Sequence, residues 1–142
     1  MLKHSPEILM QIAELYAQES RATRAKVGAV LVTSTGVLIP GYNGTPSGWD
    51  NTCEVDNKTL PYVLHAEMNC ILKCAEEGVS TKGCTIYVTH SPCWHCAACL
   101  SQCGVKAVRY KQKYGDAVKS DYNFHMQDIK CQQIIDGYTT GE

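Results

Sequence analysis

Residues 84–110 read CTIYVTHSPCWHCAACLSQCGVKAVRY and predict a strand, a helix and a second strand in close succession. Residues 84–89 and 105–110 have the β-branched and aromatic composition that is typical of strands. Between them, Ser91 and Pro92 are typical of an N-cap followed by proline at the first helical position. Two strands joined by one helix form a parallel pair through a right-handed crossover. This stretch therefore predicts an α/β fold.

The upstream segment adds a helix and two more strands. The apolar side chains of residues 6–20 recur at helical spacing. Residues 27–32, VGAVLV, are apolar on both faces, as in a central strand that is covered on both sides. Residues 37–39 predict a strand that pairs back on it. Pro40 should lie at the end of that strand, because proline has no N–H group to donate to a sheet.

A long polar loop and a second helix follow. Residues 41–57 are rich in Gly, Asn, Asp, Thr and Pro, and loops of this length inside compact domains are typically functional. The helix expected over residues 63–77 ends at Gly78 as its C′ residue. Toward the C-terminus, residues 122–130 are weakly helical and residues 131–135 predict a fifth strand. These elements together predict a layered α/β domain with a mixed sheet.

The composition is that of a globular chain without a basic excess. Its 142 residues are 44% hydrophobic and 19% charged, which predicts a single domain over residues 1–142. Lys and Arg number 13 against 14 Asp and Glu, for a formal net charge of -1. Because proteins that bind polymeric nucleic acid neutralise phosphates with basic residues, no such partner is expected. A small-molecule substrate is the better expectation.

The N-terminal residues and the cysteines indicate the cellular compartment. The start of the chain carries Lys3, Glu7 and Glu14, so we expect neither the apolar stretch of a signal peptide nor a membrane span. Nine cysteines, an odd number, without a secretory signal are typical of a reduced, cytoplasmic protein. In that compartment, clustered cysteines favour metal binding or catalysis over disulfides.

Four cysteines form a run with the spacing C-x2-C-x2-C-x3-C: Cys93, Cys96, Cys99 and Cys103. Alone, this run is compatible with an iron–sulfur cluster, a redox C-x-x-C pair or half of a zinc site. The bacterial ferredoxin run ends in C-P, whereas glycine follows Cys103, which weakens the first alternative. Residues 65–67, His-Ala-Glu, complete H-x-E…P-C-x-x-C at two predicted helix starts. This pair is the signature of zinc deaminases.

The chemistry of this signature separates three ligands from a proton carrier. Zinc takes thiolates and neutral imidazole in a tetrahedral shell, and Cys93, Cys96 and His65 supply these groups. The first turn of a helix favours thiolates. A catalytic zinc keeps its fourth position open for water, and Glu67 is expected to carry protons and not to bind the metal.

The remaining cysteines are not expected to bind metal. Cys53 lies in the polar loop and is expected to be an exposed thiol. Five further cysteines are expected to be small core residues, namely Cys70, Cys74, Cys84, Cys99 and Cys103.

Three stretches resemble the deoxycytidylate deaminases of the cytidine deaminase-like superfamily: GYNGTPSG at 41–48, PYVLHAEMNCI at 61–71 and YVTHSPCWHC at 87–96. The stretch GYNGTPSG distinguishes the deoxycytidylate deaminases from other branches of the superfamily, which share the zinc motifs but lack this stretch. The resemblance implies a three-layer α/β/α fold with a five-stranded mixed sheet. It also implies zinc-dependent hydrolysis of dCMP to dUMP and ammonia, which supplies dUMP for thymidylate synthesis.

The resemblance implies further contacts with the substrate. Asn43, Arg24 and Tyr114 match positions that contact the nucleotide, and Ala66 and Ser91 are expected as further substrate contacts.

Regulation and assembly are also implied by the resemblance. Allosteric members bind the regulatory nucleotide at Gly41, Tyr42, Asn43 and Gly44, with dCTP as activator, dTTP as inhibitor and Mg²⁺ accompanying the effector. Such members commonly form homohexamers. His90 departs from the family, which usually has an apolar residue there. Deamination of another cytosine nucleoside or nucleotide, and a redox role for the cysteine run, stay open as alternatives.

Overall fold

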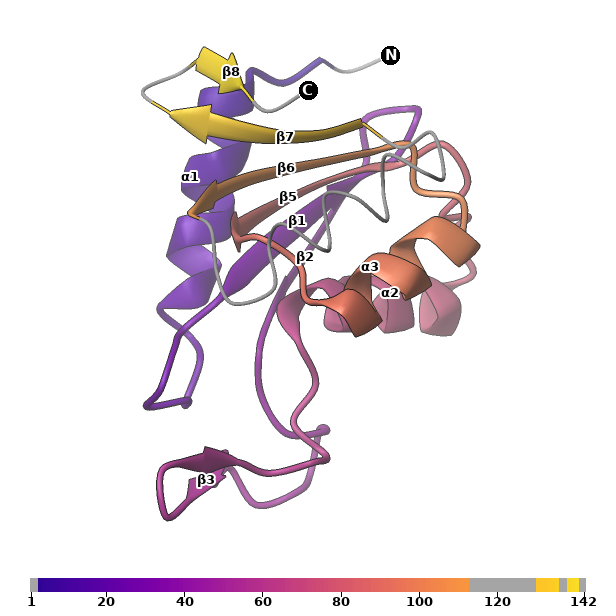
Figure 1. The fold of residues 1–142 in the computed structure, drawn as a ribbon. Coiled ribbons are helices and arrows are strands. Elements are labelled where there is room, and N and C mark those ends of the chain that lie inside the picture. The colour runs from indigo at the N-terminus through magenta and orange to yellow at the C-terminus, as the bar shows by residue number, and fades with distance from the viewer. Residues whose placement is uncertain (1–2, 113–129, 136–137, 141–142) are drawn as a thin grey trace.

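A mixed β-sheet forms the centre of the fold (Figure 1). The computed structural model describes residues 3–112, 130–135 and 138–140. The main sheet has six strands in the order β2-β1-β5-β6-β7-β8. Their bounds are Gly28–Val32 for β1, Leu38–Tyr42 for β2, Thr85–His90 for β5, Ala107–Gln112 for β6, Lys130–Ile135 for β7 and Tyr138–Thr140 for β8. The expected five-stranded mixed sheet is confirmed, and the short β8 extends it beside β7.

The strand directions follow the sequence pattern. β1 pairs antiparallel with β2 and β5, whereas β5, β6 and β7 run parallel. The middle of β1 is inaccessible to solvent, since Ala29, Val30 and Leu31 have no exposed surface. The prediction of a central strand covered on both faces is therefore confirmed, as is the parallel pair formed by the quoted strand–helix–strand stretch.

Helices cover both faces of the sheet, which confirms the three layers (Figure 1). On one face, Leu9 and Met10 of α1 pack against Val30 and Tyr87. On the opposite face, α2 and α3 pack over the core through residues such as Cys70 and Leu100. The bounds are Pro6–Ala17 for α1, Ala66–Glu77 for α2 and Trp94–Gln102 for α3.

α1 and α2 use the helix signals that the sequence displays. The Ser5 side chain accepts a hydrogen bond from the Ile8 N–H at 3.3 Å and caps α1, which ends at Ala17. α2 ends at Gly78, whose φ of 70° lies in the left-handed region that favours glycine. α1 lies so close to β1 that a Cβ atom on Gly28 would be 1.8 Å from the Ala13 carbonyl oxygen.

The start of α3 corrects the prediction. Cys93, and not Ser91, is the N-cap residue, so Pro92 lies before the helix. The physical reason is that the Ser91 N–H donates to the Gln112 carbonyl oxygen at 2.8 Å, which continues the pairing of β5 with β6. The chain can turn into the helix only after this bond. The displacement puts a cysteine at the cap position.

β2 is longer than predicted. It continues through Pro40 to Tyr42, with Pro40 opposite Val30, so the expectation that Pro40 ends the strand is wrong. Within the described sheet, β2 lies at the edge, and proline is tolerated there because its missing N–H does not interrupt the ladder.

The stretch between β2 and α2 forms an arm that projects away from the sheet (Figure 1). Its end is a two-stranded hairpin of β3 (Glu54–Val55) and β4 (Lys58–Thr59). Asp56 and Asn57 form the turn with φ values of 53° and 60°, as in the tight turns that join hairpin strands. At its base, Gly44 and Leu64 form a β-bridge that brings the two ends of the arm together.

The cysteines divide differently from the prediction. Cys70, Cys74 and Cys84 have no exposed surface and belong to the core, as expected. Cys99 is half-buried and outside the core clusters, so its assignment to the core is wrong, whereas Cys103 is half-buried but packs against the core. Cys99 lies on a partly open side of α3, whereas Cys103 packs at the edge of the core after that helix.

Cys53 is a further correction, because its side chain is only 2% exposed. The arm folds around it: the Leu60 N–H donates to the Cys53 carbonyl oxygen at 2.8 Å, and the thiol contacts the Asn51 carbonyl oxygen at 3.6 Å. The helix expected over 122–130 lies outside the described residues apart from Lys130, where β7 begins. The predicted strand over 131–135 is confirmed as part of β7.

Candidate metal centre and active site

Two helix N-termini meet beyond the end of β5, and each contributes metal-binding side chains. His65 is the N-cap residue of α2, and Cys93 is the N-cap residue of α3. Both have extended backbones, with ψ values of 157° and 172°. Cys96 is the third residue of α3 and has no exposed surface. Because helix N-termini carry unpaired N–H groups and a positive dipole end, they stabilise thiolates here.

The distances among these three side chains fit a tetrahedral zinc ion. His65 Nδ1 lies 3.2 Å from Cys96 Sγ and 3.5 Å from Cys93 Sγ. All three ligand atoms lie within 4.8 Å of one another. Tetrahedral zinc with ordinary Zn–N and Zn–S bonds holds nitrogen and sulfur about 3.6 Å apart. Within the described ranges, no other group of three His, Cys, Asp or Glu side chains meets this condition.

The second half of the cysteine run takes no part in this group. Cys99 Sγ lies 3.9 Å from the ring of the exposed His95, and Cys103 Sγ lies 3.5 Å from the Leu100 carbonyl oxygen. The geometry therefore does not support a four-cysteine cluster. Two cysteines and one histidine form the candidate centre.

The pKa values of the two thiols of the centre are shifted in opposite directions. The hydrogen bond with Cys96 lowers the pKa of Cys93 to about 3, and the bond with His65 adds to this effect. The same hydrogen bond and burial raise the pKa of Cys96. The bond to Cys93 also raises the pKa of His65. A metal ion that displaces the remaining proton would bind both sulfurs as thiolates.

Glu67 is a buried carboxyl group beside the metal-binding residues. It is the second residue of α2 and is 3% exposed. Burial raises its pKa to about 7. A carboxyl group with this pKa can accept and release a proton near neutral pH, which ordinary surface glutamates do not do. His65 and Glu67 converge although they are two residues apart, because His65 precedes the regular part of the helix.

A hollow of about 80 Å³ brings these groups together with residues from other segments. The end of β5 contributes His90 and Ser91, and the first residue of α2 contributes Ala66. The remaining lining residues are Val27, Asn43, Thr59, Val63, His65, Glu67 and Cys93. Thr59 and Val63 come from the arm and were not among the expected site residues: Thr59 lies outside every quoted motif, and Val63 lies within residues 61–71 without a polar group that signals a role. Only the folding of the arm brings them to the metal centre.

Asn43 lines the hollow, but its amide is already engaged in the fold. Its Oδ1 accepts from the Val27 N–H at 2.9 Å, and its Nδ2 donates to the Ala25 carbonyl oxygen at 2.8 Å. These bonds hold the loop before β1 against the start of the arm. Asn43 therefore has a structural role as well as a place in the lining.

Arg24 and Tyr114 are the other two residues expected to contact the nucleotide. Arg24 is exposed, and its Nη1 donates to Thr59 Oγ1 at 3.1 Å. This bond places the guanidinium beside a residue of the hollow. Tyr114 lies outside the described residues.

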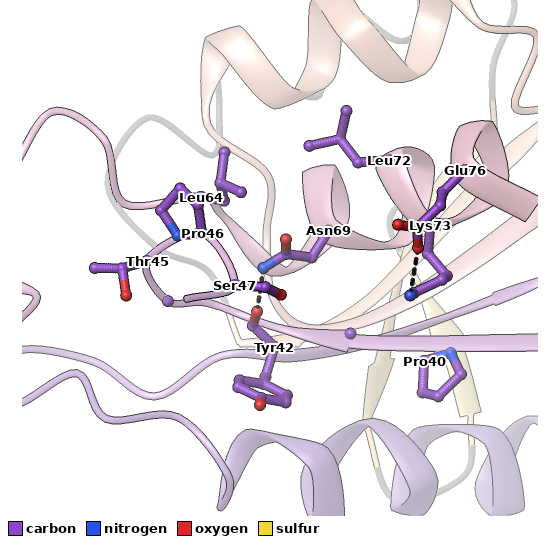
Figure 2. A pocket seen from close by; sticks show the side chains of 12 residues that line it. Pro40, Tyr42, Thr45, Pro46, Ser47, Leu64, Asn69, Leu72, Lys73 and Glu76 are labelled. Carbon is purple, nitrogen blue, oxygen red and sulfur yellow. Dashed lines mark hydrogen bonds and ion pairs between the residues drawn. The ribbon is translucent and has the colours of Figure 1, made fainter. Parts of the chain in front are cut away.

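The GYNG stretch faces a second, separate hollow of about 360 Å³ (Figure 2). Gly41, Tyr42 and Gly44 line it together with the outer side of α2, whereas Asn43 lines the catalytic hollow. Asn69 Nδ2 donates to the Tyr42 carbonyl oxygen at 2.6 Å within this lining. A further hollow of about 230 Å³ is lined by Tyr42, Asn43 and Gly44 together, so this one motif borders several cavities.

The fold and the centre define a class of protein, the zinc-dependent deaminases, in which a glutamate accompanies a His-Cys-Cys metal site. A sequence profile described as "Cytidine and deoxycytidylate deaminase zinc-binding region" matches residues 3–112. The chain belongs to this family. None of the helices in the described part of the chain is long and apolar enough to cross a membrane.

Individual relatives carry narrower names. The deoxycytidylate deaminase of Homo sapiens is 39% identical over 151 residues, which cover 92% of this chain and 83% of that protein. ComE operon protein 2 of Bacillus subtilis is 33% identical over 132 residues, which cover 90% and 70%. The crystal structure of dCMP deaminase from the cyanophage S-TIM5 in complex with dCMP and dUMP has a TM-score of 0.86 and 37% identity. That match covers 93% of this chain and 100% of the phage chain.

Proposed function

We propose that this chain catalyses the zinc-dependent hydrolysis of dCMP to dUMP and ammonia. The observation that carries the proposal is that His65, Cys93 and the buried Glu67 line one small hollow, with Cys96 in the same metal-binding group. The choice of dCMP is supported by the similarity to the cyanophage enzyme, whose structure contains dCMP and dUMP.

In this proposal, the metal site and Glu67 divide the work. Zinc, held by His65, Cys93 and Cys96, would supply Lewis-acid activation of water for attack on C4 of the cytosine ring. Glu67 would take a proton from the attacking water and pass it to the ring nitrogen. It would then carry the proton of the new C4 hydroxyl group to the amine, so that the C4–N bond breaks, ammonia leaves and a C4 carbonyl remains. The raised pKa of Glu67, about 7, supports this role because both protonation states are accessible.

The remaining contacts would orient the nucleotide. Arg24 is the candidate for the 5′-phosphate, because a guanidinium presents paired donors to phosphate oxygens. Asn43 is the candidate for the deoxyribose, and its place in the hollow supports this role. Ala66 and Ser91 line the same hollow beside the metal ligands. Tyr114 is kept as a proposed contact on the ground of the family resemblance.

The proposal also includes regulation by a nucleotide effector. A nucleotide effector, dCTP as activator or dTTP as inhibitor, would bind at Gly41, Tyr42, Asn43 and Gly44, in a homo-oligomer such as a hexamer. The separate hollow beside this stretch supports the location (Figure 2). Nothing in the described residues supports Mg²⁺ beside the effector, so the ion is left out of the proposal.

The test is ammonia release from dCMP, deoxycytidine, CMP, cytidine and dCTP, measured in parallel with and without dCTP and dTTP as effectors. We expect dCMP to have the highest kcat/KM. A preference for another cytosine nucleoside or nucleotide would overturn the choice of substrate and leave the deaminase class intact. Equal rates with and without both effectors would overturn the regulatory part alone.

A further inference from the structure

One pair of facing residues in the hairpin holds Arg24 by both its backbone and its side chain. Glu54 and Thr59 lie opposite one another in the register of β3 and β4. Glu54 Oε2 accepts from the N–H groups of Thr23 at 3.0 Å and Arg24 at 3.1 Å, and Oε1 accepts from Thr23 at 3.2 Å. Thr59 Oγ1 accepts from Arg24 Nη1 at 3.1 Å. The arm is thus tied to the loop before β1 at this pair.

The bonds at Glu54 join a negative charge to two consecutive N–H groups. Hydrogen bonds to an ionised carboxylate are stronger than those between neutral groups. The bond from the Arg24 N–H is the main cause that lowers the pKa of Glu54, and the nearby guanidinium acts in the same direction. The carboxylate is therefore ionised at neutral pH, and it holds the backbone from which the Arg24 side chain projects.

The hydrogen bond to Thr59 determines the position of the Arg24 guanidinium. Thr59 lines the catalytic hollow together with Glu67, so the guanidinium lies beside the hollow. Its bond to Thr59 uses one of five N–H donors, and a planar guanidinium can offer a pair of the others to a phosphate. One hairpin residue fixes the start of the Arg24 side chain, and the facing residue fixes its end.

We infer that Glu54 and Thr59 are positioning residues that hold Arg24 for the 5′-phosphate, and that they set the preference for a nucleotide over a nucleoside. This inference rests on the proposed function, in which Arg24 binds the phosphate. A long, exposed arginine loses conformational freedom when it binds an anion. Because Glu54 and Thr59 already restrain both ends of the Arg24 side chain, the entropic cost of binding a substrate with a phosphate is lower. This restraint has no effect on the chemistry at the cytosine ring.

The test compares dCMP with deoxycytidine in Glu54→Ala, Glu54→Gln, Thr59→Val and Thr59→Ser. We expect Glu54→Ala to lower the ratio of their kcat/KM values about tenfold, mainly through KM for dCMP. Glu54→Gln and Thr59→Ser, which keep an acceptor, should lower it less. In an Arg24→Gln background, Glu54→Ala should cause little further loss, because the two residues act as a unit. Glu77→Gln, an exposed glutamate on α2, is the matched control.

A binding measurement without turnover completes the test. In calorimetric titrations of the zinc-loaded protein, Glu54→Ala should weaken dUMP more than deoxyuridine. Equal losses for nucleotide and nucleoside, or lost zinc, would mean that Glu54 serves only the fold and would overturn the inference. If the unmodified protein did not prefer dCMP to deoxycytidine, the proposed function would fail first, before any variant is compared.

Discussion

The two sides of the catalytic hollow are built in different ways. The helix side consists of His65, Cys93 and Cys96 with the buried Glu67, at two helix starts over the central sheet. The arm side consists of exposed or half-exposed residues that come together only through the hairpin and the loop before β1. Burial raises the pKa of Glu67 on the helix side, which suits this carboxyl group for proton transfer. The exposed Arg24 side chain on the arm side is open to a ligand.

Substitutions on the two sides of the hollow should therefore cause different losses of activity. Changes on the helix side should abolish the reaction for every substrate, whereas changes on the arm side should alter only the ranking of substrates.

Cys96→Ser should remove both the metal and the activity. A serine hydroxyl is not deprotonated as a thiol is when zinc binds, so the site would lose an essential ligand. Metal analysis after gel filtration should find no zinc, and ammonia release should fall below detection for all substrates. Treating the unmodified protein with a chelator should cause the same loss, reversed by added Zn²⁺. A Cys96→Ser protein with one zinc per chain would contradict the ligand assignment.

Glu67→Gln should keep zinc and lose catalysis. The amide has nearly the same shape but cannot carry protons, and general acid–base catalysis contributes about 10²- to 10⁴-fold. We expect kcat to fall by this amount for both dCMP and deoxycytidine, with zinc content as the control. Turnover of dCMP near the unmodified rate would exclude Glu67 as the proton carrier.

Arg24→Gln should separate the two sides of the hollow. Losing a charge-assisted contact with phosphate should lower kcat/KM for dCMP by about 30-fold, with a much smaller change for deoxycytidine. Rising salt should weaken dCMP binding in the unmodified protein more than in the variant, because salt screens the exposed charge. A parallel loss for both substrates would place Arg24 outside phosphate recognition.

Cys99→Ser should have the smallest effect and serves as the control for Cys96→Ser. Cys99 is half-buried and takes no part in the metal-binding group. Substitutions at such positions typically change the free energy of unfolding by about 0.5 kcal/mol or less. Zinc content and kcat should stay close to those of the unmodified protein, because Cys99 supplies none of the metal-binding atoms. Loss of zinc would restore the case for a four-cysteine site.

α3 begins two residues later than its local helix signals indicate. Ser91 and Pro92 have the residue types of a helix start, yet Cys93 takes the cap position. Residue type measures a local preference, whereas the Ser91–Gln112 bond depends on a strand that lies elsewhere in the chain. The structure nevertheless brings His65, Cys93 and Cys96 together, as H-x-E and C-x-x-C predict through residue type and short spacing.

The amino-acid sequence alone determined the layered α/β fold, the covered central strand β1 and the residues of the metal centre. These features follow from hydrophobic periodicity and from the chemistry of His, Cys and Glu, which neighbouring residues express locally. Tertiary structure alone decided that Asn43 lines the hollow beside the metal centre, that Cys53 is buried, and that Glu54 and Thr59 hold Arg24. The bonds of Glu54 and Thr59 to Arg24 join residues 30 and 35 positions apart, and no local pattern encodes such a long-range contact between an arm and a loop.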